Sequence, residues 1–156
     1  MALEIERRFL LKHVPDIKYD KELFIIQYYM KDGYRLRSQL DYDTDKTTYY
    51  QTFKKATDNP MVDEENDIEI SRKEFDKLYK PKKVLKSIEK DRNVKFLDKD
   101  GLKFEIDNFQ GGLVVVIAEI EIPTIEYDLV LPDYIQKVLL LEVTEHRQFK
   151  NYNLAG

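Results

Sequence analysis

The sequence predicts a mainly β fold: an antiparallel meander of eight strands with a few accessory helices. Eight segments alternate apolar and polar residues, which is typical of half-buried strands. In several of them charge recurs at every second position, as in Glu4, Glu6 and Arg8. Because strand side chains alternate faces, Ile5 and Phe9 then lie opposite these charges. Each such strand therefore has one ionic face and one apolar face.

The expected strands are short and separated mostly by turns. Asp32 and Gly33 form one tight hairpin turn, Lys99 to Gly101 form another, and Gly111 with Gly112 form a third. The strands are expected at about 3–12, 23–31, 33–40, 47–55, 64–70, 84–97, 102–109 and 113–122. The polar segment 56–66 is expected to be a loop. The order of strands and turns predicts pairing between sequence neighbours.

Helices are expected at three places. Ser71 and Glu74 form a capping box, and a short helix then runs to about Lys80 before Pro81 ends it. A second helix is expected from Pro132, and a short terminal helix within 145–155. None of these segments is long, so the helices accompany the sheet and do not form a separate layer.

Composition narrows the function. A chain of 156 residues with 42% hydrophobic content fits one domain, 1–156, with its own core. The net charge of -4 argues against a nucleic-acid partner, since such proteins usually carry a basic excess. There is no cysteine, and we expect neither a signal peptide nor a membrane span. We expect a cytoplasmic protein, monomer or homodimer, with a small-molecule ligand.

The ionic strand faces allow two interpretations. For a single strand, a solvated charged face is the commoner explanation, and the whole chain could be an ordinary β protein of that kind. When the strands are considered as a set, however, a covered outer face is favoured. The last expected strand has apolar side chains at every second position: Val114, Val116, Ala118, Ile120 and Ile122. The sheet would then be an inverted barrel with the charges lining its lumen.

A charged lumen is suited to a compact anion. Six cations supply donors for phosphate oxygens: Arg8, Arg35, Arg37, Lys54, Lys90 and Arg92. Carboxylates repel phosphate unless a hard cation lies between them, and Mg²⁺ or Mn²⁺ binds both kinds of oxygen. His13 and His146 lack zinc-type spacing and are expected at the surface. Basic residues beside paired acids therefore indicate a metal together with a polyphosphate.

The chain resembles the CYTH superfamily, the triphosphate tunnel metalloenzymes, whose hallmark is Glu-x-Glu-x-Lys on the first strand. The resemblance covers nearly the whole chain, and its specificity lies in the ordered set of motifs. The matching segments are 4–10, Tyr34 to Arg37, Thr52 to Lys54, Ile88 to Arg92, Phe104 to Asp107, Ala118 to Glu121, Glu142 to Thr144, and Phe149 to Asn151 with Leu154 and Ala155.

The resemblance implies an eight-stranded, closed antiparallel β-barrel tunnel that binds a triphosphate. Its metal ligands would be Glu4, Glu6, Glu119 and Glu121, holding Mg²⁺ or Mn²⁺. The substrate-binding residues would be Arg8, Arg35, Arg37, Lys54, Lys86, Lys90 and Arg92, and the residues expected at the reaction centre are Arg8, Tyr29 and Lys90. Possible accessory acids are Asp67, Glu69, Glu105 and Asp107.

Two positions depart from the family pattern. Arg8 stands where the signature has lysine, the residue that a tyrosine, here Tyr29, accompanies in short bacterial members. Arginine keeps its proton near neutrality, so Arg8 is expected to bind phosphate and not to act as a base. Gln148 stands where the closing segment often has arginine, which removes one possible contact.

The function expected from the sequence is metal-dependent hydrolysis of tripolyphosphate to pyrophosphate and phosphate. Three activities of the same superfamily remain as alternatives: class IV adenylyl cyclase, thiamine triphosphatase and RNA 5′-triphosphatase. A non-catalytic polyphosphate-binding module is an alternative of another class, and it predicts binding without turnover.

Overall fold

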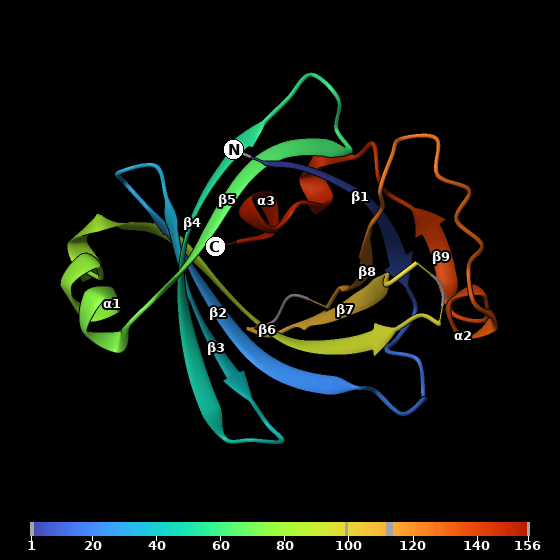
Figure 1. Cartoon of the computed structure of the whole chain (residues 1–156), viewed down its shortest axis with the longest axis horizontal. Coiled ribbons are helices and arrows are strands. Elements are labelled where there is room, and N and C mark those ends of the chain that lie inside the picture. The colour runs from blue at the N-terminus through green and yellow to red at the C-terminus, as the bar shows by residue number, and fades with distance from the viewer. Residues whose placement is uncertain (1, 99, 112–113, 156) are drawn as a thin grey trace.

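The computed structural model describes residues 2–98, 100–111 and 114–155. Its core is one antiparallel sheet in the order β5-β4-β3-β2-β6-β7-β8-β1-β9, closed by an additional β5–β1 pairing (Figure 1). The strands are β1 (Ala2–Leu11), β2 (Lys21–Met30), β3 (Arg35–Asp41), β4 (Lys46–Ala56), β5 (Val62–Ile70), β6 (Val84–Phe96), β7 (Lys103–Phe109), β8 (Val116–Glu121) and β9 (Leu139–Glu142). The predicted closed barrel of eight antiparallel strands is thereby confirmed.

Strand β1 closes the barrel because its two halves have different partners on one side. Its first half pairs with β5, with Ala2 opposite Glu65 and Ile5 opposite Val62. Its second half pairs with β9 on that side and with β8 on the other. The ninth strand therefore extends the sheet along β1 without adding to the closed ring.

The register turns the charged faces inward. Residues directly opposite each other in antiparallel strands share a face, and β1 places Arg8 opposite Glu119. On the adjacent strands β6 and β7, Arg92 is opposite Asp107 in the same way. Charged side chains from many strands thus converge in the lumen, as the two-residue spacing predicted.

The outer apolar face of β1, β7 and β8 is covered. Phe9, Phe104 and Ile120 are buried there with Ile135 of helix α2 (Asp133–Gln136). Burial of this kind contributes about 1.5–3 kcal/mol per large apolar side chain. Val114 is an exception among the alternates expected to be covered, because β8 begins only at Val116 and Val114 is exposed.

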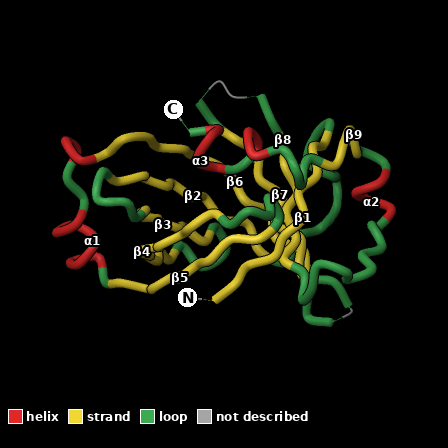
Figure 2. The backbone as a smooth tube through the Cα atoms, turned by 90° about the horizontal axis from the view of Figure 1, so that it is seen from above, coloured by secondary structure: helices red, strands yellow, loops and turns green. Residues whose placement is uncertain are grey.

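The opposite end carries helix α1 (Arg72–Leu78), and Figure 2 shows α1 and α2 at the two ends of the molecule. Ser71 caps α1 in the predicted capping box with Glu74. Phe75 packs against Met30, Leu36 and Ile70. The short 3-10 helix η1 (Pro81–Lys83) then leads into β6.

The end of the chain returns to the lumen as the 3-10 helix η2 (Arg147–Phe149) and helix α3 (Asn151–Leu154). In Figure 1, α3 lies inside the ring of strands. Its apolar residues pack with lumen-facing side chains of β6, β7 and β8, in a cluster of Ile88, Phe109, Ile117 and Ala155 with Phe149 and Leu154 beside it. The tail is therefore part of the wall of the tunnel.

Some boundaries differ from the sequence expectation. The loop expected at 56–66 is shorter, because β4 runs to Ala56 and β5 begins at Val62. The Thr57 hydroxyl, which hydrogen bonds to the Val62 carbonyl, tightens the turn. Strand β9 was not expected.

Lys99, Gly112 and Leu113, parts of an expected turn or strand, lie outside the described residues. No helix of the described chain is both long and apolar enough to span a membrane.

Candidate functional site

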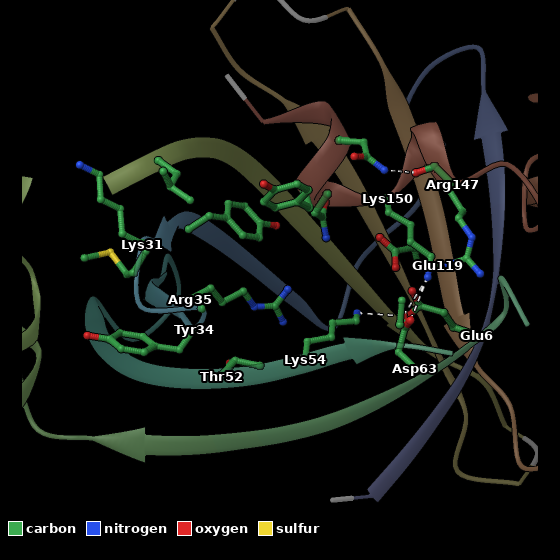
Figure 3. Close-up of a pocket in the computed structure, with 18 residues that line it drawn as sticks. Glu6, Lys31, Tyr34, Arg35, Thr52, Lys54, Asp63, Glu119, Arg147 and Lys150 are labelled. Atoms are coloured by element: carbon green, nitrogen blue, oxygen red, sulfur yellow. Dashed lines mark hydrogen bonds and ion pairs between the residues drawn. The ribbon is translucent and has the colours of Figure 1, made fainter. Parts of the chain in front are cut away.

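A cavity of about 470 Å³ occupies the lumen beside the C-terminal segment (Figure 3). Its walls come from β1, β2, β3, β4, β5, β6 and β8, and from Arg147 and 150–153 of the C-terminal segment. The charged residues that line it are Glu6, Lys31, Arg35, Lys54, Asp63, Glu119, Arg147 and Lys150. Acids and bases thus share one partly open cavity of a size suited to a small anionic ligand.

Two buried carboxyl groups form the acidic side of this cavity. Glu6 lies on β1 and Glu119 on the adjacent strand β8, and both are about nine-tenths buried. Burial raises the pKa of Glu119 to about 8, and the neighbouring Glu6 adds to the effect. Burial also raises the pKa of Glu6, although Lys54 partly opposes this. One of the two is therefore readily protonated when no cation lies between them.

A third acid, Asp63, is tied to lysines. Lys150 Nζ donates to both carboxylate oxygens of Asp63, at 2.9 and 3.2 Å. Lys54 Nζ lies 3.6 Å from Asp63 and 3.4 Å from Glu4. Burial alone would lower the pKa of Lys54, but Glu6 and Glu4 outweigh it and the net shift is upward. Lys54 thus stays charged among the acids of β1 and β5.

Two residues that line the cavity carry buried donors without a partner. The Tyr29 hydroxyl and Arg35 Nε are buried without a hydrogen-bond partner among the described atoms, although the other end of the Arg35 guanidinium reaches Glu65 at 3.1 Å. Burial raises the pKa of Tyr29, so its hydroxyl keeps its proton. Leaving a buried donor unsatisfied costs about 1–3 kcal/mol. A ligand that supplies acceptor oxygens would remove this cost.

The wall formed by β6 and β7 is different because its charges neutralise one another. Lys90 Nζ lies 2.8 Å from Asp107, and Arg92 donates to both Asp107 and Glu105. The side chains of Lys90 and Asp107 are inaccessible to solvent. Burial would raise the pKa of Asp107, but Arg92 and Lys90 outweigh it and lower it to about 2. Burial lowers the pKa of Lys90 to about 8, against the pull of Asp107.

The other residues expected at the site lie on the lumen side but do not line the cavity. Arg8 is buried and donates to Glu6 Oε1 at 3.1 Å and to the Thr144 carbonyl at 2.7 Å. Arg37 pairs with Asp67 at 3.2 Å, and Lys86 reaches the Tyr152 carbonyl at 3.3 Å. Glu69 and Glu121 are exposed. Of the site residues expected from the sequence, those brought together in the cavity are Glu6, Tyr29, Arg35, Lys54 and Glu119.

The donor set suits a divalent cation in its chemistry. Carboxylate oxygens are the ligands that Mg²⁺ and Mn²⁺ prefer, and a cation between Glu6 and Glu119 would offset the repulsion that raises the pKa of Glu119. Across the described residues, however, no three acidic, His or Cys side chains are already arranged to hold an ion. A metal would bind with some rearrangement of these acids.

Sequence reasoning missed Asp63, Arg147 and Lys150. Asp63 is the first member of an alternating acidic series with Glu65 and Asp67, but it fell in the segment interpreted as a loop. Lys150 lies in the closing motif, where nothing local marks its distant partner. The signal for Asp63 was thus in the sequence, whereas the Lys150 contact needed the fold.

Comparison with known proteins finds relatives by structure. No protein-family model matches the chain, and no curated protein sequence matches it. The crystal structure of the inorganic triphosphatase NE1496 matches with a TM-score of 0.61 at 28% identity, covering 99% of this chain and 95% of that one. The PH1819 protein from Pyrococcus horikoshii OT3 matches with a TM-score of 0.60 at 16% identity, covering 79% and 80%.

The match to NE1496 runs over nearly the full length of both chains, and it agrees with the closed barrel and its inward-facing charges. The match to the Pyrococcus protein supports the fold alone. The resemblance indicated by the motifs is confirmed, and the chain has the CYTH fold of the triphosphate tunnel proteins.

Proposed function

We propose that this protein hydrolyses inorganic triphosphate to pyrophosphate and phosphate in the charged lumen, with a divalent metal ion as cofactor. The observation that carries the proposal is the 470 Å³ cavity, whose lining combines Tyr29 and Arg35, each with an unpartnered donor, and the paired acids Glu6 and Glu119. Such a cavity offers hydrogen bonds and positive charge to phosphate at one side and oxygen ligands to a metal at the other. The structural similarity to an inorganic triphosphatase supports the same reaction.

In this proposal, the chain's own residues bind and orient the phosphates. Arg35 and Lys54 balance the charge that spreads over the phosphoryl oxygens, and the Tyr29 hydroxyl donates to one of them. Glu6 and Glu119 would hold Mg²⁺ or Mn²⁺, with Glu4 and Glu121 nearby as further acids. When bound, the metal supplies charge neutralisation and orients the attacking water.

The position of Arg8 favours a supporting role for it. Its guanidinium is 1% exposed and is held by Glu6 and the Thr144 carbonyl, so it fixes the Glu6 carboxylate from behind the cavity. The proposal therefore places Arg8 as a positioning residue for Glu6. Lys90 has a similar supporting role on the wall formed by β6 and β7, where it contacts Asp107 and Asn151.

The test is phosphate release from tripolyphosphate by the purified protein with Mg²⁺ or Mn²⁺, with ATP and thiamine triphosphate as comparison substrates. Glu119→Gln should reduce kcat about a hundredfold or more while the chain stays folded, because the amide removes a metal ligand. Glu89→Gln, on the exposed outer face of β6, is the matched control and should leave the rate unchanged. No phosphate release with any of these substrates would refute the proposal.

One observation favours a second candidate, a polyphosphate-binding protein without turnover. Within the part of the chain that the structure describes, the acids do not form a ready three-ligand metal site. The binding module predicts that tripolyphosphate binds equally well with and without metal and is recovered intact. The triphosphatase predicts metal-dependent release of phosphate.

A further inference from the structure

The cations that line the cavity are not equivalent. Arg35 pairs with Glu65, and Lys54 and Lys150 both pair with Asp63. Lys31 is exposed at the end of β2. Arg147 is half-buried in the wall, and it forms no ion pair with any described carboxylate. Its positive charge is therefore not balanced by an acid within the described structure.

Arg147 is also held in place. Its Nη2 donates to the Thr57 carbonyl at 2.8 Å, which ties the C-terminal segment to the turn between β4 and β5. The Asn153 side chain donates to the Arg147 carbonyl at 2.7 Å. In Figure 3, the Arg147 side chain extends toward the end of the cavity where Glu6 and Asp63 lie. One nitrogen of the fork is used by the protein, which leaves the others for acceptor oxygens.

A fixed guanidinium without an acid partner is suited to phosphate, because its planar donors match two phosphate oxygens at once. A second lining residue points to a ligand independently, since Arg35 Nε is buried and unpartnered. We propose that Arg147 is a substrate-binding residue that the C-terminal segment adds to the barrel and that contacts a terminal phosphate of the triphosphate. This inference rests on the proposed function and assigns a further residue to the same site.

The proposal also bears on Gln148. Gln148 is exposed, whereas its neighbour Arg147 lines the cavity. A guanidinium one residue earlier in the 3-10 helix η2 thus supplies the charge that position 148 lacks. The ion-paired Lys150 has a different role, in which it fastens the tail to β5 through Asp63.

The experiment is calorimetric titration of inorganic tripolyphosphate into the full chain in EDTA, so that binding is measured without turnover. Arg147→Gln should weaken binding about tenfold to a hundredfold, the effect of losing a charge-assisted hydrogen-bond pair. Arg147→Lys keeps the charge but not the fork and should weaken it less. Asn153→Ala loosens the same segment without removing the cation, and it should weaken binding by less than about fivefold.

The outcomes separate the two proposals. If the wild type binds and Arg147→Gln binds within about twofold of it, the assignment of Arg147 is wrong while the proposed function stands. An equal loss of affinity in Asn153→Ala would also overturn the assignment, because the effect would then be structural. If Arg147→Gln has a lower melting temperature, the affinities of Arg147→Lys and Asn153→Ala decide. Weaker binding by Arg147→Lys than by Asn153→Ala supports the assignment, and the reverse order overturns it. A wild type that does not bind tripolyphosphate in EDTA overturns the assignment of Arg147, whereas the proposed function falls only if phosphate release with Mg²⁺ or Mn²⁺ is also absent.

Discussion

Two walls of the same lumen use similar residues for different purposes. On β6 and β7, Lys90 and Arg92 are neutralised by Asp107 and Glu105, and the side chains of Lys90 and Asp107 are closed off from solvent. Around the cavity, donors of Tyr29 and Arg35 are left without partners. The comparison teaches that the number of lumen cations does not define the binding site. Arg35, Lys54 and Lys150 also pair with acids, and the cavity side differs in its partial solvent access and in the donors that have no partner.

Asp107→Asn gives the largest expected effect. The substitution leaves Lys90 and Arg92 buried without their shared carboxylate, which should lower the free energy of unfolding by about 3–5 kcal/mol. Asp63→Asn is the comparison variant, and its cost should be smaller because Lys54 and Lys150 are partly hydrated. Guanidinium unfolding measures both. If Asp63→Asn costs as much as Asp107→Asn, the two walls do not differ as described.

Tyr29→Phe sharpens the comparison on the cavity side. Removing the hydroxyl should weaken tripolyphosphate binding about threefold to tenfold, the value of one hydrogen bond, while metal-free stability is unchanged or slightly higher. Tyr134→Phe is the matched control, since that hydroxyl is also buried and unpartnered but lies beside the outer core. Titration calorimetry compares the two. Equal effects of the two substitutions on affinity would contradict a hydrogen bond between the Tyr29 hydroxyl and tripolyphosphate.

The pH dependence of stability tests the carboxyl pair. The pKa of Glu119 is raised in the folded state to about 8, so the folded chain binds this proton more tightly than the unfolded chain does. The contribution is present at low pH and is lost as pH rises from about 4.5 toward 8. Relative to Glu119→Gln, the metal-free wild type should lose about 1 kcal/mol or more across this range, seen as a falling melting temperature. A constant difference would contradict the raised pKa.

Arg7→Gln should have the smallest effect. Arg7 lies on the outer face of β1 and pairs with Glu142, and both side chains are partly exposed. An exposed pair contributes about 0–1 kcal/mol, so stability should change little and triphosphate hydrolysis not at all. Urea unfolding and the phosphate-release assay check this. A large loss of activity would mean that the outer face also takes part.

The two-residue spacing of charge predicted much of the fold. Because strand side chains alternate, Glu4, Glu6 and Arg8 had to share a face, and the apolar alternates of β8 favoured the inward direction for the charges. The capping box likewise located α1 from local sequence. These features depend on neighbouring residues along the chain, which is why they could be predicted.

The composition of the cavity could not be predicted in the same way. Strand alternation makes Arg35 and Lys90 look alike, and only the folded structure shows that Lys90 Nζ lies 2.8 Å from Asp107, on the neighbouring strand. The contact of Lys150 with Asp63 joins residues 87 apart. Pairings at this distance depend on how the strands and the tail pack, so the sequence identified the lumen but not its open part.

The most direct test of the central claim is a crystal structure with bound tripolyphosphate. The account predicts phosphate density in the 470 Å³ cavity, with oxygens at the Tyr29 hydroxyl and Arg35 Nε. Density against Lys90 and Arg92, with Asp107 displaced from them, would contradict it. So would density found only on the outer surface of the barrel.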